Sequence, residues 1–186
     1  LFKSVMGDAH YRGGPGNIDE KIADLKMLNP DQLVASIYDL TGFQWVYNGY
    51  PMFQNDQIGL QTLAGSADGQ TVAANARTPN PTMILVHARI AELAAFFAVD
   101  REMALPSSER TLFRHLEPNQ HFEEDVEASV TQIQHLHRRI LSRSIAPDGP
   151  EVEANRRLWT DLYGVSADTS AAWAGLVSVL LRDPNF

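Results

Sequence analysis

The chain of 186 residues contains no cysteine. Disulfide bonds, thiolate metal sites, cysteine nucleophiles and covalent haem attachment through Cys-x-x-Cys-His are therefore excluded. Positive charge is also scarce, because 15 Lys and Arg residues stand against 23 Asp and Glu residues and leave a formal net charge of −8. A surface of this charge repels phosphate backbones, so we expect no nucleic-acid partner.

Long hydrophobic runs and processing signals are missing as well. The longest apolar run, Ala171–Leu181, ends at Arg182 and is only about half a bilayer span, so the sequence predicts no membrane span. The chain opens with Leu1, Phe2 and Lys3, without an initiator Met or a visible signal peptide. We therefore expect a processed chain or a piece of a longer protein, in which any export signal lies upstream.

Catalytic motifs are absent too. There is no nucleophile elbow, no phosphate-binding glycine loop, no His-Glu-x-x-His and no recognisable serine triad pattern. A non-enzymatic role is favoured, and no cofactor is predicted.

What the sequence does contain is apolar residues, 44% of the chain, repeating at helical spacing. They predict an all-α fold, an irregular bundle of five or six helices with a long aromatic-rich loop region at about 43–80. Short loops predict that the last three helices pack as antiparallel neighbours. We expect one domain over 1–186, with a possible subdivision into 1–80 and 81–186. The predicted helices are 29–41, 81–98, 107–116, 123–143, 150–163 and 169–182, with a short helix at 18–27.

The inward positions of these helices define the expected core. Each inward Leu or Ile should contribute roughly 1.5–3 kcal/mol through burial. The predicted core residues are Leu33, Ile37, Val86, Ile90, Leu93, Phe97, Val130, Ile133, Ile140, Leu158, Leu162, Leu176 and Leu180.

An aromatic cluster marks the region after the first predicted helix. It consists of Trp45, Tyr47, Tyr50 and Phe53. On a functional interpretation these side chains form a surface that stacks on a sugar or a flat cofactor. On a structural interpretation, which we favour, they fill the gap between the helix at 29–41 and the C-terminal bundle.

The histidines are the main candidates for metal chemistry. His115 and His121 flank the turn at 117–119 and could bind a metal together with Glu123 or Glu124, although a solvated loop is the favoured interpretation. His135 and His137 are two residues apart on one helix, so they point in different directions and cannot ligate one ion as a simple pair. His87 and His137 lie on apolar flanks, where hydrogen-bonded boundary histidines are expected.

Several short segments resemble a known family. These are Gln134–Leu141, Ala146–Asp148, Pro150–Val152, Leu180–Phe186, and the stretch from Tyr47–Tyr50 to Leu63–Gly69. Their succession is similar to helical C-terminal modules of large exported bacterial proteins of the planctomycete cytochrome-associated type. The resemblance implies an exported, multi-domain context (periplasm or cell surface) and supplies no catalytic residues.

Three functions remain open at this point. The favoured one is a non-catalytic helical module with a role in assembly or docking, whose partners are neighbouring domains of the parent chain or another protein. The second is a carbohydrate or flat-ligand binding module that uses the aromatic cluster. The third is a metal-dependent or acid–base enzyme centred on His115 and His121.

Overall fold

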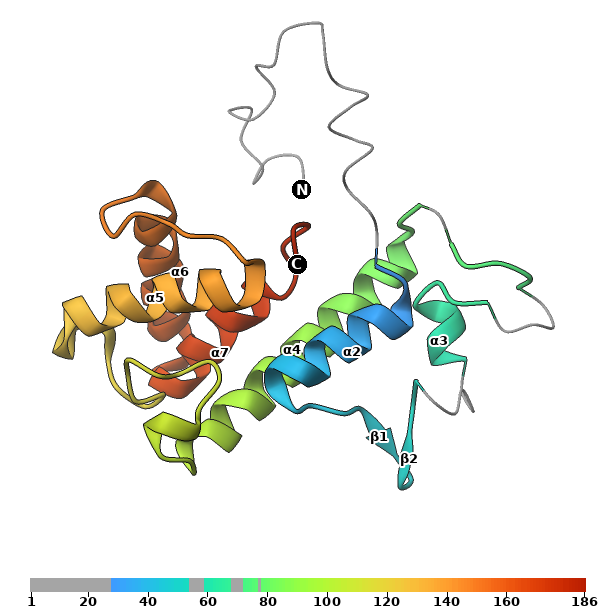
Figure 1. Cartoon of the computed structure of the whole chain (residues 1–186), viewed down its shortest axis with the longest axis horizontal. Coiled ribbons are helices and arrows are strands. Elements are labelled where there is room, and N and C mark those ends of the chain that lie inside the picture. Colours follow the sequence, from blue (N-terminus) through green and yellow to red (C-terminus); the bar gives the residue numbers. More distant parts are fainter. Residues whose placement is uncertain (1–27, 54–58, 68–71, 77) are drawn as a thin grey trace, which may run out of the picture.

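The computed structural model describes residues 28–53, 59–67, 72–76 and 78–186 (Figure 1). In this part the prediction of an all-α irregular bundle is confirmed, because six helices are accompanied by only one two-stranded sheet. The helix predicted at 18–27 lies outside the described residues. The elements are α2 (Pro30–Thr41), β1 (Val46–Tyr47), β2 (Tyr50–Pro51), α3 (Leu60–Leu63), α4 (Pro81–Met103), α5 (Val126–Leu141), α6 (Pro150–Ser166) and α7 (Thr169–Leu180).

Helix α2 begins and ends where its local signals predict. Asn29 Oδ1 accepts a hydrogen bond from the Gln32 backbone N–H at 2.8 Å, and Gln32 Oε1 accepts one from the Asn29 N–H at 3.1 Å. This capping box satisfies two N–H groups that the helix leaves free. Gly42 ends the helix with a φ of 71°, a conformation that glycine adopts without strain.

Helix α4 is the longest element and connects the two sides of the fold. It extends to Met103, beyond the predicted end at 98, because Val99 and Glu102 continue its buried face. It packs against α2 and α3 on one side and against α7 on the other. The apolar runs predicted no membrane span, but by length and composition α4 is long and apolar enough to cross a membrane. In the structure, 44% of its most apolar 18-residue window is buried.

Helix α7 lies at the centre of the C-terminal bundle, in contact with α4, α5 and α6. Its Trp173, Leu176 and Val177 are fully buried. The Trp173 ring meets Trp159 of α6 and Phe122 at centroid distances of 5.8 and 6.0 Å. In Figure 1, α6 runs steeply across α5, so these two helices cross instead of packing antiparallel as predicted.

The helix predicted at 107–116 is wrong. Only one 3₁₀ turn, Ser107–Glu109, forms there, and the following residues are irregular. The cause is Glu102, a side chain 2% exposed, whose carboxylate accepts hydrogen bonds from the backbone N–H groups of residues 111, 112 and 113. Gln132 of α5 binds the Leu112 carbonyl and the His115 N–H in the same segment. Side chains that are distant in sequence therefore replace the helical hydrogen bonds.

Most of the predicted core is buried or half-buried. The exception is Phe97, which is 42% exposed. Its ring lies against Phe43 at a centroid distance of 5.8 Å, at the edge of the contact between α4 and the chain after α2. The prediction for Phe97 was wrong because helical spacing does not distinguish the centre of a buried face from its edge.

Candidate functional site

The region predicted as an aromatic-rich loop contains a β-hairpin. Strands β1 and β2 pair antiparallel, with Tyr47 opposite Tyr50 and Val46 opposite Pro51. The two turn residues, Asn48 and Gly49, have φ values of 50° and 82°. Positive φ at both positions is what a type I′ turn needs, and Asn-Gly is its preferred sequence. The dipeptide Asn48-Gly49 between aromatic residues was therefore a signal for the hairpin that the sequence analysis missed.

The four aromatic residues of this region fall into two groups. Tyr47 and Tyr50 are 53% and 52% exposed, and Val46 beside them is also exposed. Phe53 is buried in the core, and Trp45 is half-buried and packs against it. Figure 1 shows the hairpin projecting away from α2 and α4. We call Tyr47 and Tyr50 the hairpin surface.

The structural interpretation of the aromatic cluster thus applies to Trp45 and Phe53, and the functional interpretation applies to Tyr47 and Tyr50. Phe53 and Trp45 anchor the base of the hairpin, where the Met52 N–H donates to the Trp45 carbonyl at 2.9 Å. Gln61 of α3 also hydrogen-bonds the Phe53 carbonyl. The exposed tyrosines pack little of the core and remain available to a ligand or partner.

The two candidate metal ligands have different surroundings. His121 accepts a hydrogen bond from the Glu123 N–H through Nδ1 at 3.2 Å and places its ring against Trp159 and Tyr163 of α6. His115 instead faces His135 of α5, with ring centroids 5.2 Å apart. Among the residues that the structure describes, no group of three or more His, Asp or Glu side chains is arranged to hold a metal ion. The predicted site at His115 and His121 therefore gains no support from this part of the chain.

His137 is the boundary histidine that its place in the helical stripe predicted. It is buried, and its Nε2 lies 2.9 Å from Asn155 Nδ2 of α6. The same Asn155 nitrogen donates to the Glu151 carbonyl at 2.7 Å, so it presents an N–H to the histidine and holds Nε2 unprotonated. Burial lowers the pKa of His137 below its ordinary value, and Arg143 lowers it further.

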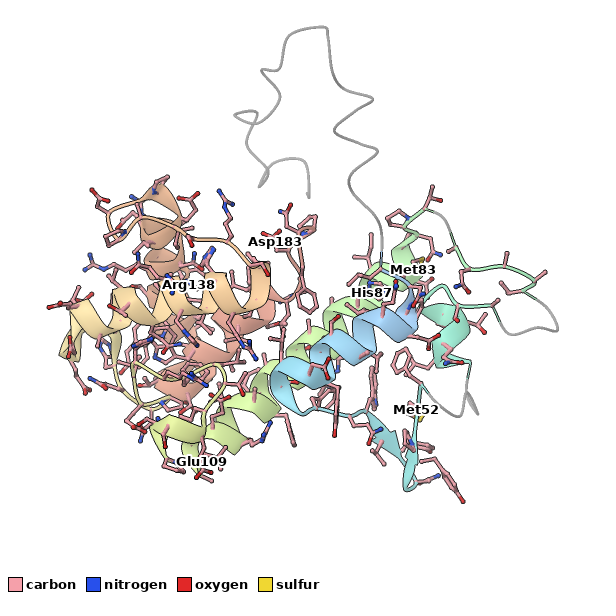
Figure 2. The ribbon with its side chains drawn as sticks, in the orientation of Figure 1. Met52, Met83, His87, Glu109, Arg138 and Asp183 are labelled. Carbon is pink, nitrogen blue, oxygen red and sulfur yellow. The ribbon has the colours of Figure 1, made fainter. Side chains whose placement is uncertain are left out.

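His87 lies on the opposite side of the fold, beside Met83 on α4 (Figure 2). Burial lowers its pKa, against a hydrogen bond with the backbone of Ala64 that raises it. For both His87 and His137, burial is the largest cause of the lowered pKa, because it disfavours the charged imidazolium.

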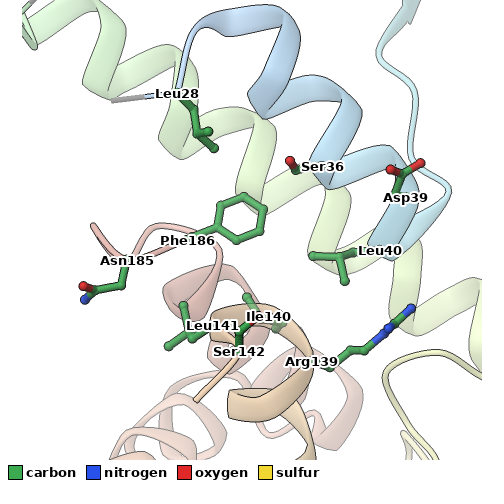
Figure 3. A pocket seen from close by; sticks show the side chains of 10 residues that line it. All are labelled: Leu28, Ser36, Asp39, Leu40, Arg139, Ile140, Leu141, Ser142, Asn185 and Phe186. Carbon is green, nitrogen blue, oxygen red and sulfur yellow. The ribbon is translucent and has the colours of Figure 1, made fainter. Parts of the chain in front are cut away.

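A pocket of about 470 Å³ lies between α2, the end of α5 and the C-terminal residues (Figure 3). Its apolar wall comes from Leu40, Leu141 and Phe186, while Asp39 and Arg139 stand at its rim. The pocket combines apolar surface with two opposite charges, which suits binding more than bond-breaking chemistry.

Comparison with protein-family models, curated proteins and solved structures finds no match for this chain.

Proposed function

We propose that this chain is a non-catalytic docking module of a larger exported bacterial protein, and that the hairpin surface is the contact it offers to a neighbouring domain or another protein. The observation that carries the proposal is the pair of half-exposed tyrosines on a projecting hairpin. The exported, multi-domain setting rests on the resemblance of the sequence segments alone.

Tyrosine is suited to such a contact. Its ring provides apolar area with few rotatable bonds, its hydroxyl keeps a polar end, and it is enriched in protein interfaces. The direct pairing of Tyr47 with Tyr50 places both rings on one face of the hairpin. The turn and the buried residues at its base fix that face before binding, which reduces the entropy cost of association.

The neighbouring elements also carry exposed apolar side chains. These are Leu63 on α3, and Ile84 and Leu85 at the start of α4. Exposed apolar side chains also occur on other described elements, such as Val126 on α5 and Val165 on α6, so the proposal rests on the paired tyrosines.

A carbohydrate or flat-ligand function is the second candidate, favoured by the same exposed tyrosine pair. Sugars stack on aromatic faces, and two rings on one face of a hairpin would provide such a platform. Fluorescence titration with soluble polysaccharides separates the candidates, because only the second predicts a saturable change that disappears in a Tyr47→Ser, Tyr50→Ser variant.

The docking proposal is tested in the protein as the producing cells make it. Tyr47→Ser with Tyr50→Ser should abolish co-purification of the partner, or loosen the contact between domains of the parent chain as measured by limited proteolysis. Tyr38→Ser, which removes an equally exposed tyrosine from α2, is the matched control. Unchanged association in the hairpin variant, or equal loss in both variants, would contradict the proposal.

A further inference from the structure

Uncompensated positive charge gathers between the irregular 110–116 segment and α5. Five of the ten arginines in the described part of this acidic protein pair with a carboxylate, namely Arg89, Arg110, Arg143, Arg156 and Arg157. Arg114 and Arg139 are exposed and form no ion pair with any described carboxylate. In a chain with a net charge of −8, their guanidinium groups remain free to pair with an acidic partner.

Two histidines complete this group. The rings of His115 and His135 meet edge to face with centroids 5.2 Å apart. His135 Nε2 donates to the Thr111 carbonyl at 3.0 Å, and Arg114 Nε donates to the Arg110 carbonyl at 2.7 Å. Arg139 follows His135 by four residues on α5, which places both on one face of the helix. We call Arg114, His115, His135 and Arg139 the basic surface.

The charges around His135 favour an anion over a cation. Burial lowers the pKa of His135 most, and His115, Arg114 and Arg139 each lower it further, against the hydrogen bond to Thr111 that raises it. The charged groups that act on this histidine are thus all basic. A metal cation would meet the same repulsion, whereas a carboxylate would be attracted by the guanidinium groups of Arg114 and Arg139.

We propose that the basic surface docks an acidic peptide segment of a partner protein. A long phosphate backbone fits less well, because the net charge of the chain repels it outside this small area. The pocket beside Arg139 adds the apolar wall of Leu40, Leu141 and Phe186, so the segment should carry an apolar side chain next to its acidic ones. Asp39 at the same rim excludes a carboxylate from that end of the pocket.

The acidic segment would be a partner for the docking role proposed above, on which this proposal rests. It would bind the basic surface and not the hairpin surface. Figure 1 shows α5 and the hairpin on opposite sides of the molecule. Loss of binding at one surface therefore leaves the other unaffected, and the two proposals can fail separately.

The test is fluorescence anisotropy of the intact chain with a labelled twelve-residue peptide that contains four glutamates and one leucine. The double variant Arg114→Gln, Arg139→Gln should weaken peptide binding about tenfold, because it removes the two arginines that pair with the peptide carboxylates. The control is the double variant Arg89→Gln, Arg157→Gln, which changes the net charge by the same amount at exposed sites elsewhere. It should weaken peptide binding less than about twofold.

Comparison ligands identify the anion. Replacing the glutamates by glutamine should abolish binding, and replacing the leucine by serine should reduce it. The proposal is overturned if the peptide does not bind, if both double variants behave alike, or if inorganic phosphate or oligo(dT) binds more tightly than the peptide.

Discussion

Glu102 determines the shape of the segment that joins α4 to the C-terminal bundle. Its buried carboxylate accepts hydrogen bonds at 2.7–3.1 Å from three consecutive backbone N–H groups. Glu102→Ala leaves those groups buried without acceptors, and we expect a loss of about 3 kcal/mol or more in the free energy of unfolding. Glu102→Gln keeps one acceptor oxygen and should lose less. Urea denaturation measures both.

The control for Glu102 is Glu92→Gln. Glu92 pairs with Arg89 three residues earlier on α4, and both side chains are about half exposed. Such pairs contribute about 0.2–1 kcal/mol, so the control should be nearly neutral. A loss below about 1 kcal/mol for Glu102→Ala would show that the carboxylate does not hold the segment.

His137 should make stability depend on pH. Its folded-state pKa lies below the ordinary value of 6.5, so the folded state binds a proton less readily than the unfolded state does. The contribution of the neutral histidine is therefore fully present above pH 6.5 and is lost as the pH falls through the lowered pKa. We expect the free energy of unfolding to decrease between pH 7.5 and pH 5.5, that is, over roughly one unit on either side of the ordinary pKa.

His137→Gln provides the comparison, because glutamine does not titrate. The variant should be less stable at pH 7.5 but show a shallower decrease toward pH 5.5. A residual decrease is expected, since burial also lowers the pKa of His87 and His135. Equal slopes in wild type and variant would mean that His137 does not couple folding to pH.

At the scale of elements, the contact between α6 and α7 depends on a small residue. A Cβ at Gly175 of α7 would lie 2.7 Å from Leu162 Cδ1 of α6. Gly175→Ala therefore forces the Leu162 side chain or the two helices to shift, which costs about 1–3 kcal/mol. A gain in helix propensity of about 0.5–1 kcal/mol offsets part of this cost, so we expect a net loss of roughly 0.5–2 kcal/mol. Thermal or urea unfolding measures the change.

Gly164 of α6 is the matched position. A Cβ there meets nothing within 4 Å, so Gly164→Ala adds helix propensity without a clash. It should stabilise the protein by about 0.5–1 kcal/mol. If both alanine variants were stabilising, the close approach of α6 and α7 at Gly175 would be refuted.

Local signals explain which elements the sequence predicted. Asn29 and Pro30 at one end and Gly42 at the other specify α2 without help from the rest of the chain. The same kind of signal, Asn48-Gly49, specifies the hairpin, so that element is also predictable from local sequence. The irregular segment after 109 was not predictable, because its hydrogen bonds come from Glu102 and Gln132.

The sequence predicts where the candidate site lies but not which of its residues are exposed. Aromatic residues between two turns indicated a special region, but their alternation did not separate exposed Tyr47 and Tyr50 from buried Phe53. That separation follows from how the base of the hairpin packs against the core. The partners of His115 and His121 depend on α5 and α6, so residue spacing along the loop could not reveal them.

At the scale of the whole molecule, α4 and α7 form the structural framework. Helix α7 is surrounded by α4, α5 and α6, and α4 also carries α2 and α3. The framework presents the hairpin surface on one side and the basic surface on the other. A molecule with two such faces on a helical body is suited to joining partners, in agreement with the proposed docking role.

Site-specific photo-crosslinking tests the docking role most directly. A photoreactive phenylalanine analogue at position 47 or 50, incorporated in the cells that produce the protein, should form a crosslink to one defined protein or to one neighbouring domain of the parent chain. The same analogue at position 38 should form little or none. Absence of crosslinks at 47 and 50, or equal crosslinking at all three positions, would contradict the account.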